Sequence, residues 1–127
     1  MKEVMAIIRM NKITETKEAL SKAGFPSITC RKVYGRGKKK VDFELIEELI
    51  DGQPIAEPSV LESISENHRL IAKRYLTIVV DDDDASKVVD LIIKANQTGN
   101  MGDGRIFVSS IGDAIRVRTS ENGVAAI

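Results

Sequence analysis

The spacing of apolar residues predicts a strand, a helix and a second strand in the first part of the chain. Residues 4–8 form a short apolar run rich in β-formers, which predicts a buried strand. Apolar residues recur at helical spacing over residues 13–23, and Gly24 follows them as a stop signal. Residues 27–34 alternate between the two sides of an extended chain, which predicts a strand with one mixed face.

The last part of the chain repeats this order. Residues 75–80 are the clearest strand in the pattern, and residues 85–95 have the apolar stripe of a helix. The aspartates at 81–84 suit the N-terminus of that helix, where they meet the positive end of its dipole. A Ca²⁺ or Mg²⁺ site is the alternative, but consecutive carboxylates point in different directions. Residues 105–110 and 113–118 predict two short strands separated by a turn.

A long segment of different character separates these two parts. It begins with a basic stretch at 35–40, continues to about residue 70, and contains apolar residues that predict one short helix at 43–50. A segment of this length between strands is typical of a functional loop or of a disordered segment. The whole pattern predicts one α+β domain over residues 1–127, with ferredoxin-like βαββαβ order, a long loop at about 37–70, an extra C-terminal strand and a loosely held tail at 119–127.

Composition narrows the class of protein. Hydrophobic residues make up 43% of the chain and aromatic residues 4%, so we expect an aliphatic core. The 19 basic and 19 acidic residues balance, so no net charge attracts nucleic acid or an acidic membrane, and no apolar run is long enough to span a bilayer. Cys30 is the single cysteine; we expect it to be a small buried strand residue, in a reducing, cytoplasmic location.

A glycine-rich loop at 98–105 is the first candidate for chemistry. Gly99, Gly102 and Gly104 lie close together, so backbone N–H groups can converge on an anion, and Arg105 adds a positive charge. The loop follows a helix and lacks the Gly-Lys-Ser/Thr ending of a Walker A motif. An ordinary turn between a helix and a strand is the alternative interpretation.

Two arginines strengthen the case for an anion. In a strand, Arg116 and Arg118 would share a face, and a triphosphate suits two neighbouring guanidinium groups. An exposed face paired with glutamate fits the same spacing. The sequence has no Cys/His cluster for a transition metal and no nucleophile beside an obvious base, so the pattern favours a binding protein over an enzyme.

These features together resemble the PII signal-transduction family. The strongest matching segments are TGNMGDGRIF at residues 98–107 and AIRVRT at residues 114–119, and AIIR at 6–9 also fits. RKVYGRG at 31–37 and NQTG at 96–99 make the chain most similar to the nitrogenase-associated NifI branch, and to the second of its paired proteins.

The resemblance implies a trimer of ferredoxin-like subunits with ATP or ADP bound in clefts between them. It assigns the nucleotide to a glycine-rich loop, two phosphate-binding arginines, the base of the mobile loop and two lining positions. In this chain these residues are Thr98, Gly102, Asp103, Gly104, Arg105, Arg116, Arg118, Gly35, Gly37, Ile7 and Thr29. The resemblance also implies that Lys73 contacts 2-oxoglutarate.

The chain departs from the family pattern at the effector site. Lys39 stands where typical members have a glutamine that helps to hold Mg²⁺ and 2-oxoglutarate. A protonated lysine cannot ligate a metal, but it can pair directly with a carboxylate. Both tyrosines, Tyr34 and Tyr75, lie outside the mobile loop, so we do not expect the uridylylation that some relatives undergo.

We therefore expect a nitrogen regulatory protein rather than an enzyme. With ATP or ADP, Mg²⁺ and 2-oxoglutarate as ligands, its long loop would bind the dinitrogenase component of nitrogenase and inhibit it when fixed nitrogen is plentiful. The chain would form a homotrimer or, with a sister PII-like protein, a mixed hexamer. A small phosphate-transferring enzyme on a ferredoxin-like scaffold and a nucleic-acid-binding module are the alternatives.

Overall fold

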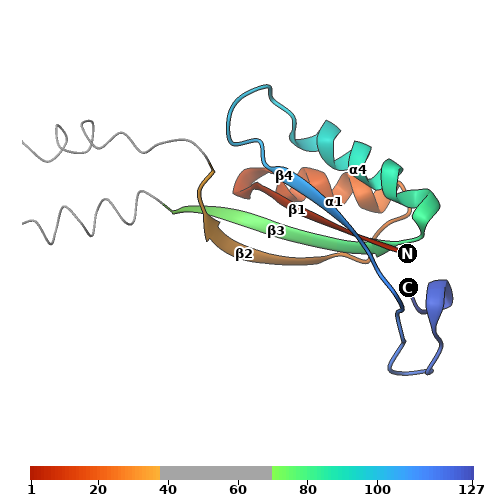
Figure 1. Ribbon diagram of the computed structural model, residues 1–127. Coiled ribbons are helices and arrows are strands. Elements are labelled where there is room, and N and C mark those ends of the chain that lie inside the picture. The colour runs from red at the N-terminus through yellow and green to blue at the C-terminus, as the bar shows by residue number, and fades with distance from the viewer. Residues whose placement is uncertain (38–69) are drawn as a thin grey trace, which may run out of the picture. The chain divides into compact units, whose positions relative to one another are not determined.

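A computed structural model describes residues 1–37 and 70–127. Its elements in chain order are β1 (Lys2–Arg9), the 3₁₀ turn η1 (Met10–Lys12), α1 (Ile13–Lys22), β2 (Thr29–Gly35), β3 (Ile71–Val80), α4 (Asp82–Asn96), β4 (Arg105–Ser110) and the 3₁₀ turn η2 (Gly123–Ala126) (Figure 1). By their contacts the residues divide into two compact units, Met1–Val33 with Lys73–Ile127 and Tyr34–Ala72. The helix predicted at 43–50 lies outside the described residues.

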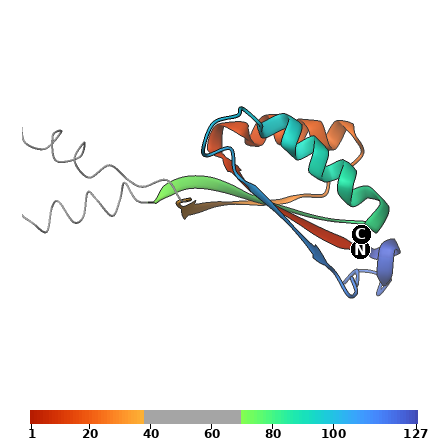
Figure 2. The ribbon, with the colours of Figure 1, turned by 45° about the horizontal axis from the view of Figure 1, so that its top comes forward.

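The strands form one sheet in the order β2-β3-β1-β4. β1 pairs antiparallel with both β3 and β4, so Ala6 lies opposite Leu76 on one side and Ile106 on the other. Both helices cover the same face of this sheet (Figure 2). The two central strands come from different halves of the chain, which confirms the predicted α+β, ferredoxin-like class.

Alternation along the strands decides which side chains are buried. Val4, Ala6 and Ile8 of β1 are at most 2% exposed and point toward the helices. The rest of the core comes from β3 and from both helices, namely Leu76, Ile78, Val80, Leu20, Val88 and Ile92. Each such aliphatic side chain contributes about 1.5–3 kcal/mol by leaving water. The core is aliphatic, as the composition predicts.

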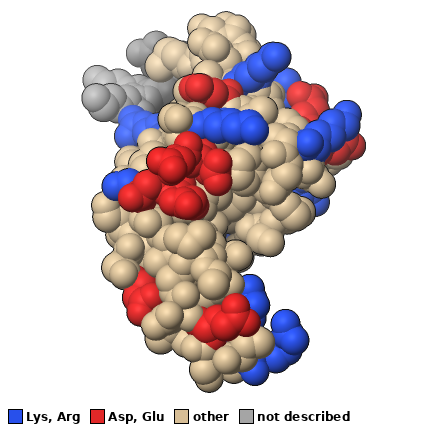
Figure 3. Space-filling model, turned by 90° about the vertical axis from the view of Figure 1, so that its right-hand side faces the viewer, with Lys and Arg blue, Asp and Glu red and all other residues tan. Residues whose placement is uncertain are grey.

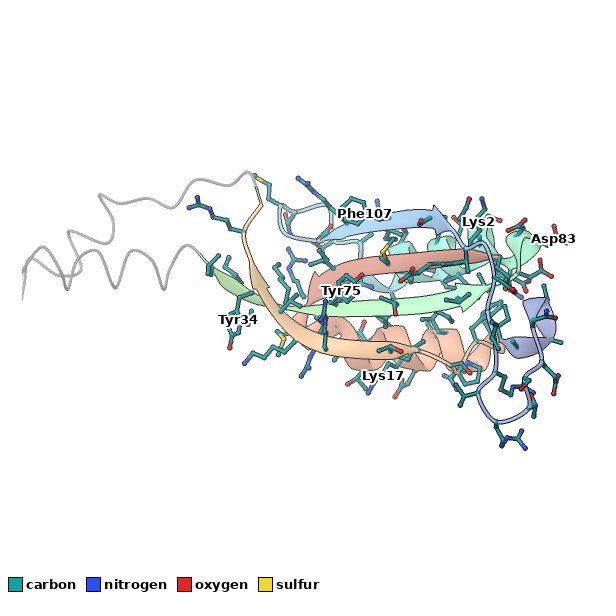
Figure 4. All side chains as sticks on the ribbon, turned by 60° about the horizontal axis from the view of Figure 1, so that its bottom comes forward. Lys2, Lys17, Tyr34, Tyr75, Asp83 and Phe107 are labelled. Atoms are coloured by element: carbon teal, nitrogen blue, oxygen red, sulfur yellow. The ribbon has the colours of Figure 1, made fainter. Side chains whose placement is uncertain are left out.

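The opposite face of the sheet is open in the single chain. Met5 and Ile7 point to this face because they alternate with the buried residues of β1. Phe107 of β4 is the register partner of Met5, and Tyr75 of β3 is the partner of Ile7 (Figure 4). Phe107 is 49% exposed. The open face therefore carries apolar side chains beside polar ones such as Glu3 and Thr77, and apolar residues on a sheet face are normally covered.

Helix α4 begins where the aspartates predict it. Asp81 is the N-cap residue, without a side-chain cap hydrogen bond, and the first turn contains Asp82, Asp83 and Asp84. The N-terminal ammonium of Met1 lies 2.9 Å from Asp82 Oδ1, and this contact lowers the pKa of that carboxyl. Acidic side chains gather on this side of the molecule (Figure 3). The aspartates thus lie at the positive end of the helix dipole, and Asp82 also pairs with a cation.

The structure corrects the expectation for Cys30. The side chain is exposed, although a buried position is predicted. The physical reason is the place of β2 at the edge of the sheet, where Val33 and Gly35 are its only partly buried residues. Alternation predicts the strand correctly, but it does not tell an edge strand from a central one.

The strand predicted at 113–118 is also wrong. Only a single bridge forms there, between Ile115 and Asn122. The chain turns back at residues 117–119, and the N–H of Ser120 donates to the carbonyl of Arg116 at 2.8 Å. The tail at 119–127 is held by this turn and ends in η2, whereas a loosely held tail is predicted. Strand alternation therefore does not place Arg116 and Arg118 on one face.

Candidate nucleotide-binding site

The glycine-rich loop joins the end of α4 to the start of β4. Gln97 ends the helix in an extended conformation, with φ −68° and ψ 121°. Gly99, Gly102 and Gly104 follow with φ of +83°, +95° and +117°, all in the left-handed region that favours glycine. The backbone of the loop therefore requires glycine at these three positions. An ordinary turn between a helix and a strand, the alternative interpretation of the sequence, would not require all three.

Asp103 is the centre of the loop. Its Oδ2 accepts hydrogen bonds from the backbone N–H of Thr98 at 2.8 Å and of Gly99 at 3.0 Å. Its Oδ1 accepts a hydrogen bond from Thr98 Oγ1 at 2.5 Å. The N–H groups at the start of the loop thus converge on a carboxylate of the loop itself, whereas the sequence predicts that they bind the anion of a ligand.

Arg9 connects the loop to the end of β1. Its Nη1 lies 2.5 Å from Asp103 Oδ1, and its Nη2 donates to the carbonyl of Met101 at 2.9 Å. The hydrogen bonds from Thr98, joined by that from Arg9, hold the pKa of the Asp103 carboxyl well below its usual range. Sequence reasoning does not select Arg9 as a site residue; the signal available is its place as the last residue of a buried strand.

Lys73 brings a second cation to this end of the sheet. It is the register partner of Arg9, and its Nζ donates to the carbonyl of Gly102 at 3.1 Å. Partial burial and the neighbouring Arg9 lower the pKa of the Lys73 ammonium, while Asp103 partly offsets them. Two cations therefore share one carboxylate here, and the exposed Arg105 adds a third positive group at the loop exit. The excess of positive charge suits an anion.

The remaining predicted site residues have different surroundings. Ile7 is the register partner of Arg105, and its carbonyl lies against Gly104. Thr29 is exposed at the start of β2. Gly35 and Gly37 belong to the unit Tyr34–Ala72 and have open space around the Cα atom. Lys39 and residues 38–69 of the predicted mobile loop lie outside the described residues.

The segment that follows β4 contains Arg116 and Arg118, and it lies at the other end of this strand from the glycine-rich loop (Figures 1 and 2). Arg116 Nη1 is 3.2 Å from Glu121 Oε1, and its Nη2 donates to the carbonyl of Ala125 at 2.8 Å. Arg118 is exposed in the turn at 117–119. The structure therefore does not bring these arginines to the loop of their own chain.

Within residues 1–37 and 70–127, no three His, Cys, Asp or Glu side chains gather as metal ligands would. Over the same residues, no helix has the length and apolar character that a membrane crossing requires.

The chain is similar to known proteins along its whole length. The family model for "Nitrogen regulatory protein P-II" matches residues 1–121. "Nitrogen fixation nifHD region GlnB-like protein 2" of Methanobacterium ivanovii is 46% identical, over 100% of this chain and 99% of that protein. The protein of the same name from Methanothermococcus thermolithotrophicus is 48% identical, over 100% and 98%. "Nitrogen regulatory protein P-II" of Bradyrhizobium diazoefficiens is 38% identical, over 100% of both chains.

Gly104 should tolerate no side chain. A methyl group there would lie 2.0 Å from the carbonyl oxygen of Ile7, at a φ of +117°. We expect Gly104→Ala to separate β1 from the loop and to lower the free energy of unfolding by about 3 kcal/mol or more, measured in urea. Gly99→Ala is the matched control, because its φ is +83° but nothing lies within 4 Å; it should cost about 1 kcal/mol. Equal losses would contradict the close contact.

Asp103 should make the fold sensitive to acid. Because its folded pKa is depressed, its stabilisation is complete above the unfolded pKa of about 3.9 and is lost as the pH falls through the folded value. The free energy of unfolding should therefore fall more steeply between about pH 4 and pH 2 in the wild type than in Asp103→Asn. Thr98→Val removes the hydroxyl donor and should raise the pKa of Asp103 in an NMR titration. An unmoved titration would argue against this hydrogen bond.

Proposed function

The chain belongs to the nitrogen regulatory protein P-II family, and we propose that it binds ATP or ADP between its copies, responds to 2-oxoglutarate and controls nitrogenase by protein contact. Members of this family are signalling regulators rather than enzymes, which sets aside the phosphate-transferring enzyme. The names of the similar proteins associate this regulator with nitrogen fixation.

The separation of the two phosphate-binding parts carries the proposal. β4 separates the loop at 98–105 from the arginines at 116 and 118. From its first to its last residue this six-residue strand spans roughly 17 Å, because each step along a strand is about 3.4 Å. One chain therefore does not bring both parts to one triphosphate. In a closed ring of identical copies, the loop of one copy can meet the arginines of the next. This arrangement supports a nucleotide site that two chains share.

The exposed apolar residues support such an assembly. Phe107 stands with Met5 on the open face of the sheet, and Val117 and Ile115 in the tail are 97% and 67% exposed. Such exposed apolar side chains would be covered if copies of the chain packed together. We propose a trimer, or a mixed hexamer with a sister chain, in which each copy is one PII-like domain of residues 1–127 with a target-binding loop at 37–70.

Within the shared site, each residue has a proposed role. Arg105, with Arg116 and Arg118 of the next copy, pairs with the phosphates, and Gly102 lets its backbone approach them. Asp103 and Thr98 shape the loop, since their polar groups are already bonded to each other. The other proposed pocket residues, for the base and the ribose, are Ile7, Gly35, Gly37, Gly104 and Thr29. Mg²⁺ typically binds nucleotide phosphates and keeps several waters.

The 2-oxoglutarate site is proposed around Lys73. Its ammonium group has three donors, and Gly102 O occupies one of them. The remaining donors can bind a carboxylate of the effector, and Lys39 would supply a second cation where relatives use glutamine. Effector binding then changes the equilibrium of the loop at 37–70 if the two loop states differ in affinity for 2-oxoglutarate.

Removal of the two arginines should abolish most of the nucleotide affinity. We expect the wild type to bind Mg-ATP in calorimetry and the variant Arg116→Ala with Arg118→Ala to bind at least about 30-fold more weakly, because charged hydrogen bonds are lost. Glu121→Ala is the control, since it releases the tail from Arg116 but keeps both arginines. Unchanged affinity in the double variant would overturn the assignment.

The same variant tests whether the site is shared. A second variant, Thr98→Val with Arg105→Ala, is defective in the loop but keeps the arginines. If the site lies between chains, trimers that contain both variants should recover nucleotide binding at the interface where two intact halves meet. If the site lies within one chain, no mixture recovers binding.

The contact with nitrogenase is open to a direct test. Tagged chain, with Mg-ATP, should retain the dinitrogenase component on a column, and 2-oxoglutarate should release it. Lys73→Ala should retain it in the presence of 2-oxoglutarate, because the effector loses its proposed cation. Release of this variant at the wild-type concentration of 2-oxoglutarate would argue against Lys73, and failure of the wild type to retain the component would refute the proposed target.

A further inference from the structure

A buried polar contact joins the two helices just before the glycine-rich loop. Asn96, the last residue of α4, is 5% exposed. Its Nδ2 donates to Thr16 Oγ1 of α1 at 2.9 Å and to the carbonyl of Ile92 at 2.9 Å. Thr16 is fully buried and donates in turn to the carbonyl of Lys12 at 2.7 Å. The hydroxyl proton is thus used, so the Thr16 oxygen is the acceptor for Asn96.

The polar pair of Asn96 and Thr16 stabilises this helix interface less than an apolar pair of similar size would. Both amide protons of Asn96 are bonded, but its Oδ1 is buried without a hydrogen-bond partner in the described part of the chain. An unsatisfied buried acceptor is destabilising, and an apolar pair of similar size at these positions would avoid it. A polar pair in an otherwise aliphatic core does, however, fix how two elements meet, because only one arrangement satisfies its hydrogen bonds.

The loop depends on that arrangement at its first residues. Thr98 follows Asn96 by two positions, and the N–H groups of Thr98 and Gly99 must reach the carboxylate of Asp103. Arg9, at the end of β1, holds the other side of the loop through the same carboxylate. Two contacts therefore hold the loop. Arg9, at the end of β1, pairs with Asp103 near the end of the loop, and Thr16 of α1 accepts a hydrogen bond from Asn96 just before the loop begins.

We infer that Asn96 is a positioning residue for the nucleotide site. Through Thr16 it fixes where α4 ends, and thereby where the loop presents its backbone to the phosphates. The inference rests on the proposed nucleotide binding, but its effect on the loop can be measured without any ligand.

The test replaces both partners by apolar residues. In Thr16→Val with Asn96→Leu, the unsatisfied oxygen disappears, so the melting temperature of the ligand-free protein should equal or exceed that of the wild type. Mg-ATP should nevertheless bind about five- to tenfold more weakly in calorimetry, because one ordering interaction is lost. Thr16→Ser keeps the hydroxyl acceptor and should bind Mg-ATP with wild-type affinity.

Amide hydrogen exchange gives the second measurement. In the ligand-free double variant, the N–H groups of Thr98 and Gly99 should exchange about tenfold faster than in the wild type, while those of the central strands keep their rates. If the double variant does not fold, Thr16→Val alone should show the same pattern of exchange.

The outcomes separate the two proposals. A stable double variant with wild-type affinity and wild-type exchange would show that Asn96 serves only the core. Wild-type protein that does not bind Mg-ATP would refute the nucleotide site. In that case faster exchange at Thr98 and Gly99 would still establish Asn96 as the residue that positions the loop, and unchanged exchange would overturn the inference as well.

Discussion

The carboxylate of Asp103 is the group on which the candidate site depends. It accepts hydrogen bonds from the first residues of the loop and pairs with Arg9 at the end of β1. It also attracts Lys73 electrostatically, so a single negative charge partly offsets two cations that are register partners. Without this carboxylate, like charges would repel at this end of the sheet and the loop would lose its internal acceptor. The loop is therefore ordered before any ligand binds, which lowers the entropic cost of binding.

The strand β4 relates this local order to the proposed function. The glycine-rich loop precedes this strand, and the tail with Arg116 follows it. Because β4 stays extended where it pairs with β1, the loop and the tail lie at opposite ends of the strand. The apolar residues on the open face of the same sheet are exposed in a single chain. Other copies of the chain would bury them and would also bring the two arginines to the loop. In the proposed assembly, nucleotide affinity and oligomer stability are thus linked, because a ligand that binds only the assembled form stabilises it.

Periodicity predicts the strands and helices from β1 to β4 correctly, because it is set by the burial of one face of each element. It is wrong for Cys30 and for the stretch at 113–118, because periodicity does not reveal whether a strand lies at an edge or whether a neighbour is available for pairing. Arg9 and Asn96 carry no local pattern that marks them as site residues, because their partners lie 94 and 80 residues away.

The order of the elements from β1 to β4, the aliphatic core, the glycine positions of the loop and the family can be inferred from the sequence alone. These properties follow from side-chain periodicity, from the backbone freedom of glycine and from motifs that lie within short segments. Three features follow only from the folded chain: the loop closes on its own Asp103, Arg9 and Lys73 meet there, and the segment that contains Arg116 leaves β4 at the end opposite the loop. Charge pairing and burial depend on distances between residues far apart in the chain, and only the folded arrangement of the sheet sets those distances.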